Sequence, residues 1–177
     1  MPIDFETDLD LFKSKLDEIK CIGGGDDAED VAGGLNSGLN MNWRSNARYA
    51  ILIADAPGHG KQYHTEEVQD DYESGDPNGL VLEELMEKYV DNNINLCLTR
   101  IDEYTDIMFD RMIKAYKARS EKSTEKPKIE VINYEEDDEN DNNNKNKEKK
   151  RTMGNLVAKT AIDIYNHYSQ KAEKNTK

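Results

Sequence analysis

One stretch of the sequence, ILIADAPGHGKQYH at residues 51–64, places an acidic side chain directly after an apolar run. Asp55 ends the run, and a loop-forming segment that contains Pro57, Gly58 and His59 follows it. Three interpretations of this aspartate compete: a nucleotide switch, a metal ligand at the end of a parallel strand, or an ordinary turn from strand to loop. Each needs different residues elsewhere in the chain.

The nucleotide interpretation depends on the segment DAPGH at residues 55–59, which has the shape of the D-x-x-G switch of GTPases. Such a switch works with an upstream G-x-x-x-x-G-K-[ST] loop that holds the phosphates. The sequence has no such loop, and its glycine-rich segment at residues 23–30 carries acidic side chains that would repel phosphates. No N-K-x-D guanine-binding motif follows residues 93–101 either. The sequence therefore argues against a GTPase.

The metal interpretation joins Asp55 to a second acidic group, which follows the glycine-rich turn and comprises Asp26, Asp27, Glu29 and Asp30. The continuous apolar run at residues 48–54 predicts a strand buried on both faces. Because α/β folds place ligands at the carboxyl ends of parallel strands, we expect both acidic groups to reach the same rim of the sheet. Converging carboxylate oxygens are the ligands that Mg²⁺ and Ca²⁺ prefer.

The elements that would position these side chains follow from apolar periodicity. Helical spacing occurs at residues 9–19, 28–43, 80–90 and 105–118, and apolar strand-like runs occur at residues 48–55, 93–101 and 128–133. Alternating strands and helices predict a mainly parallel sheet flanked by helices, which is a three-layer α/β fold. Gly33 and Gly34 lie within the second helix, where each costs about 1 kcal/mol relative to Ala, so we expect a close packing contact there.

Composition limits the rest of the chain and its partners. Of the 177 residues, 34% are charged, and the formal net charge of −13 argues against a nucleic-acid partner. No apolar run approaches the roughly 20 residues of a membrane span. The two cysteines suggest no disulfide framework, and we expect a reducing, cytoplasmic setting.

The chain divides into three predicted segments. Residues 1–134 should form the domain, and residues 135–150, rich in Asp, Glu, Asn and Lys, should form a disordered linker. Residues 151–177 should form a helix that docks on the domain.

Several of these segments together resemble a known family: residues 23–64, the GDPNG segment at 75–79, and NINLCLTRIDEYTDIM at 93–108. They are similar to the von Willebrand factor A-like domain attached to alpha-type protein kinases, over about residues 4–134. The resemblance implies a doubly wound, Rossmann-like sheet with a metal-ion-dependent adhesion site on its upper rim. Of the three loops such a site uses, the second corresponds to the turn from Asp26 to Glu29, and the third corresponds to Asp55.

The first loop of that site, a D-x-S-x-S motif, does not occur in this sequence. By the resemblance, the chain starts near the family's third strand, so we expect a fold that is incomplete at its N-terminus and binds Mg²⁺ or Ca²⁺ only weakly. The apolar strand at residues 48–54 would then have an open edge, which favours self-association. Alternatively the helices shift to cover this edge, residues 2–5 pair with it, or a partner supplies a strand.

The function expected from these features is that of a non-catalytic protein-interaction module. A rim formed by Gly25, Pro57, Gly58 and His59 would contact a protein partner, and a metal bound by Asp26, Asp27, Glu29 and Asp55 would accept a carboxylate of that partner. The alternative is a regulatory fragment of an alpha-type Ser/Thr protein kinase whose catalytic domain lies elsewhere.

Two further features leave alternatives open. His59 and His64 either structure their loop or bind a metal, and their spacing does not decide between these roles. The segment DDYESGD at residues 70–76 is expected to be a solvated acidic loop, because it lacks most of a twelve-residue calcium loop. No serine or cysteine of the chain lies in a G-x-S-x-G elbow, so no hydrolase is expected.

Overall fold

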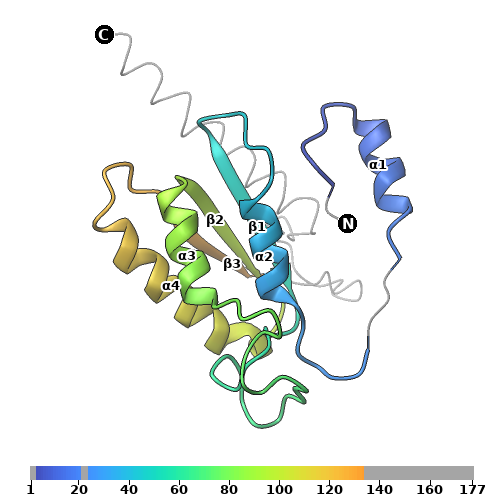
Figure 1. The fold of residues 1–177 in the computed structure, drawn as a ribbon, viewed down its shortest axis with the longest axis vertical. Helices are drawn as coiled ribbons and strands as arrows, with labels where there is room; N and C mark the ends of the chain where they lie inside the picture. The colour runs from blue at the N-terminus through green and yellow to red at the C-terminus, as the bar shows by residue number, and fades with distance from the viewer. Residues whose placement is uncertain (1–2, 21–23, 134–177) are drawn as a thin grey trace, which may run out of the picture.

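The fold is known from a computed structural model, which describes residues 3–20 and 24–133 (Figure 1). The predicted linker at residues 135–150 and the predicted helix at residues 151–177 lie outside the described residues. The elements are α1 (Leu9–Asp17), α2 (Val31–Leu39), β1 (Arg48–Ala54), α3 (Leu82–Asp91), β2 (Ile94–Arg100), the 3-10 helix η1 (Glu103–Thr105), α4 (Asp106–Ser120) and β3 (Ile129–Asn133).

The strands form a three-stranded parallel sheet in the order β1-β2-β3. Ala50 is paired in register with Leu96, and Leu96 in turn with Ile129. The helix α3 connects β1 to β2, and α4 connects β2 to β3, as parallel pairing requires. The predicted α/β class is confirmed: the described part of the chain combines a parallel sheet with four α-helices, consistent with a three-layer α/β fold.

The core lies on one face of this sheet, against α2, α3 and α4. Alternate residues of β2 point into it, because successive side chains of a strand face opposite sides. Ile94, Leu96 and Leu98 are at most 2% exposed. They contact a buried set from the three helices: Val31, Ala32, Leu35, Leu82, Leu85, Met86, Tyr89, Val90, Met108, Phe109, Met112 and Tyr116. This packing fixes the carboxyl ends of β1 and β2, where the acidic loops begin.

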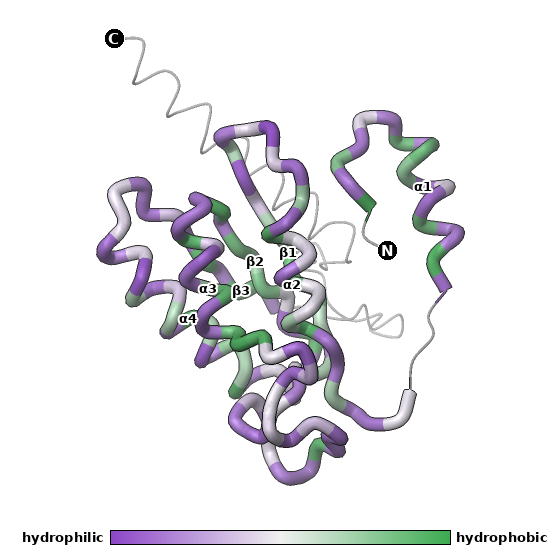
Figure 2. Tube along the Cα trace, viewed as in Figure 1, coloured by the Kyte–Doolittle hydropathy of each residue, from purple (hydrophilic) through white to green (hydrophobic). Residues whose placement is uncertain are grey.

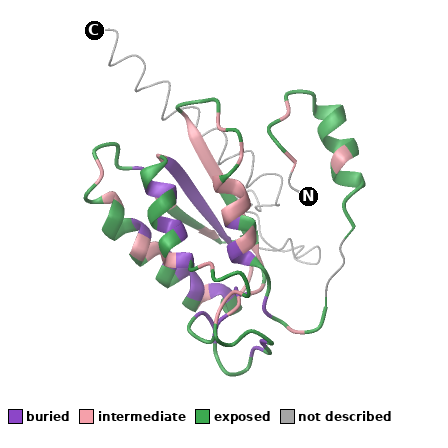
Figure 3. Cartoon of the chain, in the orientation of Figure 1, coloured by how far each residue is buried: buried purple, intermediate pink, exposed green. Residues whose placement is uncertain are grey.

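The prediction that the strand at residues 48–54 is buried on both faces is wrong. Ile51 and Ile53 on β1 are 37% and 46% exposed, whereas all but the last residue of β2 are buried (Figure 3). The reason is position: β2 lies between two strands, and among the described residues no strand pairs with the other side of β1. An apolar run alone does not distinguish a central strand from an edge strand. Self-association through this edge stays a prediction.

The first helix forms as predicted, but its apolar side chains are not buried. The Asp8 carboxylate caps α1 by accepting hydrogen bonds from the backbone N–H groups of Asp10 and Leu11, at 3.0 and 3.1 Å. No residue of α1 is buried, and Figures 1 and 2 show this helix, with its apolar positions, apart from the sheet. The preceding residues do not extend the described sheet; the Phe5 ring packs edge-on against Trp43 instead, with 4.8 Å between ring centroids.

No helix among the described residues has the length and apolar character needed to cross a membrane.

The close glycine contact in α2 occurs at Gly38 rather than at the predicted Gly33 and Gly34. Gly34 has nothing within 4 Å of an added Cβ, because it lies on the exposed side of the helix. An added Cβ at Gly33 would meet the carboxylate of Asp30, which caps the helix. At Gly38, a Cβ would lie 2.7 Å from the hydroxyl oxygen of Tyr89, a buried side chain that donates a hydrogen bond to the Leu35 carbonyl. Only Gly38 therefore permits the approach of α3.

We predict that Gly38→Ala lowers the free energy of unfolding by about 1–3 kcal/mol relative to Gly34→Ala, because both gain helix propensity but only the first clashes with Tyr89. Urea unfolding followed by circular dichroism measures the difference. Equal stability of the two variants would contradict the close contact between α2 and α3.

Candidate functional site

Three loops are held together next to the carboxyl end of β1. The acidic turn and the loop after β1 are joined by a short bridge, in which the Glu29 backbone N–H donates to the Pro57 carbonyl at 2.9 Å. A third segment, residues 65–72, joins them because the Gln69 carbonyl accepts from the backbone N–H of Asp27 at 2.9 Å and of Ala28 at 3.2 Å. These backbone contacts place the two sequence-predicted acidic groups side by side.

All four predicted metal ligands, Asp26, Asp27, Glu29 and Asp55, line one pocket of about 530 Å³. The structure thus brings Asp55 and three of the four residues of the acidic turn to a shared rim, whereas Asp30 caps α2 and does not line the pocket. The pocket also contains Glu67, from the third loop, and Asp102, which follows β2. Asp102 was missed by the sequence analysis, although the rule that located Asp55 at the end of a parallel strand applies to it equally. The metal-binding role of the four predicted residues stays a prediction.

Two of these carboxylates already have structural partners. One oxygen of Asp26 accepts from the Asp71 backbone N–H at 2.8 Å, and one oxygen of Asp27 accepts from the Gln69 backbone N–H at 3.0 Å. Asp55 is exposed. The acidic turn is therefore fastened to the third loop by matching side-chain contacts, while Asp55 faces the pocket from the opposite loop.

The predicted partner-binding rim is divided by the structure between exposed and buried positions. Gly25 is exposed, and its carbonyl accepts a hydrogen bond from the Gln69 side chain at 3.3 Å. Pro57 and Gly58 are buried, and Pro57 lines the pocket. The Gly58 N–H points to the Met108 sulfur at 3.1 Å, so this residue faces the core. Contact with a partner at these positions stays a prediction.

The prediction that residues 70–76 form a solvated acidic loop is wrong for Asp70, whose side chain is fully buried. Its two oxygens accept four hydrogen bonds: from His59 at 2.9 Å, His64 at 3.0 Å, and the backbone N–H groups of Gly60 and Tyr72 at 2.7 and 2.8 Å. A lone acid six residues after a histidine forms no motif, so no sequence signal distinguished Asp70 from its acidic neighbours.

The pKa of Asp70 reflects this environment. Burial alone would raise it, but the hydrogen bonds from His64, the Gly60 N–H, His59 and the Tyr72 N–H outweigh that effect and hold it well below its usual range. Asp70 is therefore a carboxylate at neutral pH, held between two histidines. Both histidines structure the loop, as one of the two open interpretations expected.

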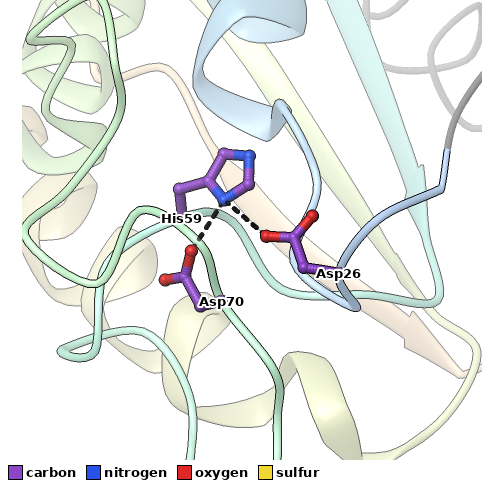
Figure 4. Close-up of side chains that lie close together, drawn as sticks. All are labelled: Asp26, His59 and Asp70. Atoms are coloured by element: carbon purple, nitrogen blue, oxygen red, sulfur yellow. Dashed lines mark hydrogen bonds and ion pairs between the residues drawn. The ribbon is translucent and has the colours of Figure 1, made fainter.

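One cluster among the described residues has ligand atoms close enough to hold a metal ion: Asp26, His59 and Asp70, all within 4.8 Å of one another (Figure 4). The His59 Nδ1 lies 2.9 Å from an oxygen of Asp70 and 3.7 Å from an oxygen of Asp26. Asp27, Glu29 and Asp55 are not part of this group. From the sequence, Asp26 is a predicted metal ligand, whereas His59 is a predicted rim residue for which metal binding stayed open.

With the geometry established, comparison with known proteins gives a partial match. Over 112 residues, or 61% of this chain, the sequence is 41% identical to the alpha-protein kinase vwkA of Dictyostelium discoideum. The chain spans only 18% of the length of that relative. No family model matches the chain, and no solved structure matches it significantly. The chain thus resembles one part of a much longer protein that is named as a kinase.

We predict that Asp70→Asn lowers the free energy of unfolding by about 3 kcal/mol or more, because the amide cannot accept all four hydrogen bonds and leaves the histidines without their anionic partner. The matched control is Asp71→Asn, which removes the same charge from the exposed neighbour. Urea unfolding at neutral pH measures both. Equal stability of the two variants would mean that Asp70 does not hold the loops.

The depressed pKa of Asp70 also fixes the sign of a pH dependence. The stabilisation of the fold by ionised Asp70 is fully present above the pKa of an aspartate in the unfolded chain, which is about 4. It is lost as the pH falls toward the lower pKa of Asp70 in the folded chain. We therefore expect the stability difference between the wild type and Asp70→Asn to shrink below about pH 4, as measured by urea unfolding across pH.

Proposed function

We propose that this chain is a non-catalytic protein-interaction module of the von Willebrand A-like type that acts in the cytoplasm. The observation that carries the proposal is the pocket at the carboxyl ends of β1 and β2, where six acidic residues converge: Asp26, Asp27, Glu29, Asp55, Glu67 and Asp102. Such a concentration of carboxylates suits a cation or a basic surface on a partner.

Several observations favour binding over catalysis. The sequence lacks the phosphate-holding loop of nucleotide hydrolases. The histidines beside the pocket, His59 and His64, both contact Asp70 rather than a candidate nucleophile. Cys97 is buried in the middle of β2, where an apolar environment leaves a thiol unreactive.

The proposed mechanism uses Mg²⁺ or Ca²⁺ held weakly in the acidic pocket. By resemblance to adhesion-type sites, Asp26, Asp27, Glu29 and Asp55 would supply oxygen ligands directly or through water, and a carboxylate of the partner would complete the coordination. The rim at Gly25 and His59 would then border the contact. Small rearrangements of the loops would bring the oxygens to bonding distance.

A second candidate function comes from the relative, which is named an alpha-protein kinase. We propose as the alternative that this chain is a regulatory part that acts on the catalytic domain of an alpha-type Ser/Thr kinase. In that case the acidic pocket would bind the kinase domain rather than an unrelated partner.

We predict that Mg²⁺ or Ca²⁺ at about tenfold excess over its dissociation constant raises the melting temperature by about 2–6 °C, because only the folded chain offers the pocket. Asp55→Ala should abolish the rise. Differential scanning fluorimetry in ion-free buffer with increasing ion concentration measures it.

The control for this measurement is Asp110→Ala, which removes an exposed carboxylate from α4, away from the pocket, and should leave the rise unchanged. No rise at millimolar ion, or an equal rise in Asp55→Ala, would remove the metal from the proposed mechanism.

The kinase alternative has its own test. We predict that the purified alpha-kinase catalytic domain of the Dictyostelium relative binds this chain in calorimetric titration, and that Asp55→Lys weakens binding at least tenfold by reversing a charge in the pocket. Asp110→Lys should bind like the wild type. Absence of binding, or equal weakening by both variants, would count against this alternative.

A further inference from the structure

We infer that Asp26, His59 and Asp70 form a binding site for a divalent transition-metal ion of the zinc class. This site shares Asp26 with the proposed magnesium or calcium site in the acidic pocket, but it uses His59 and Asp70 in place of Asp27, Glu29 and Asp55. It does not depend on the proposed interaction function. The inference is based on the positions of three ligand atoms and on the hydrogen bonds around them.

The ligand atoms have the spacing of a transition-metal site. The His59 Nδ1 lies 2.9 Å from Asp70 Oδ1 and 3.7 Å from Asp26 Oδ2 (Figure 4). Two ligand atoms bound to tetrahedral zinc at about 2.0 Å lie about 3.3 Å apart. The two observed distances fall on either side of that value, so Asp26 would move toward the ring and Asp70 slightly away from it on binding a metal, and the two carboxylate oxygens, now within 4.8 Å of each other, would reach a similar separation.

The hydrogen bonds of Asp70 leave the right lone pair for a metal. Its Oδ2 is fully used by the Gly60 N–H at 2.7 Å and by His64 at 3.0 Å. Its Oδ1 accepts from the Tyr72 N–H at 2.8 Å, and its remaining lone pair points to His59. A metal between His59 and Asp70 would use this lone pair without breaking any of the other three hydrogen bonds.

Asp26 is arranged in the same way. Its Oδ2 accepts one hydrogen bond, from the Asp71 backbone N–H at 2.8 Å, and the same oxygen faces His59. One lone pair of that oxygen therefore holds the loop and the other is available to a cation. The side chains of Asp26 and His59 are 15% and 9% exposed, so the site is largely shielded but open to ions from solvent.

His64 acts on this site as a positioning residue. Both of its ring nitrogens face oxygen acceptors, Nδ1 toward the Thr65 carbonyl at 2.8 Å and Nε2 toward Asp70 Oδ2 at 3.0 Å. These two contacts hold the ring against Asp70 from the side opposite His59. A hydrogen-bonded partner behind a metal-binding carboxylate fixes its orientation, as is common in metal centres.

The ligand types select the class of metal. Mg²⁺ and Ca²⁺ take oxygen ligands, whereas imidazole nitrogen suits Zn²⁺ and its first-row neighbours. One nitrogen and two carboxylate oxygens also leave a fourth tetrahedral position for water or a partner's donor atom. Binding through Nδ1 requires the neutral tautomer of His59 that carries its proton on Nε2.

The test is calorimetric titration of Zn²⁺ into the metal-stripped 177-residue chain. We expect binding of one ion, and we expect Asp26→Asn to weaken it at least about 100-fold, since the loss of a partner that only supports a ligand already costs about 10–100-fold. Asparagine keeps an acceptor for the Asp71 N–H, so the fold should survive. His59→Gln should have the same effect on binding.

The matched control is Asp27→Asn, because Asp27 accepts a backbone hydrogen bond as Asp26 does but contributes no ligand atom to the group. It should bind Zn²⁺ like the wild type, whereas the magnesium or calcium site of the proposed function includes Asp27. Zinc binding that is absent, that survives Asp26→Asn and His59→Gln, or that is lost equally in Asp27→Asn would overturn the inference.

Discussion

The buried carboxylate of Asp70 is the interaction on which the arrangement of the functional loops depends. Its two oxygens join the loop after β1, through His59, Gly60 and His64, to the segment that ends at Tyr72. That segment in turn holds the acidic turn through Gln69 and Asp71. A charge without solvent is costly unless it is fully hydrogen-bonded, so the four donors and the carboxylate require one another. The pocket walls are positioned through this one group.

The sheet supplies the other half of the arrangement. The core on one face fixes where β1 and β2 end, and each strand is followed within two residues by an aspartate of the pocket, Asp55 after β1 and Asp102 after β2. The acidic turn reaches the same place because it caps α2, where Asp30 accepts from the Gly33 N–H at 2.7 Å. Helix packing, strand ends and a helix cap thus bring distant segments of sequence to one rim.

Much of this arrangement is predictable from the sequence, because it depends on patterns that local chemistry dictates. The helical spacing of Val31 and Leu35 and the apolar run of β2 identify their elements, and the rule for parallel strands places Asp55 with the acidic turn. The apolar run of β1 did not reveal its edge position, because neighbours in a sheet are set by the whole chain; only the family resemblance implied an open edge at residues 48–54. The burial of Asp70 could not be predicted for a similar reason. It depends on two histidines and two loops, and the residues next to Asp70 in the sequence give no sign of these contacts.

The parallel pairing of the sheet also has a kinetic consequence. Neighbouring strands pair residues as distant in sequence as Arg48 and Ile94, so no hairpin can start the sheet. The chain therefore loses conformational entropy by closing a long loop before any contact between strands stabilises it. The contiguous segment from α3 through β2 to α4 is the most local unit in the fold. The acidic rim, whose parts come from residues 26 to 102, is complete only when β1 has joined that unit. We therefore expect the rim to be among the last features to form as the chain folds.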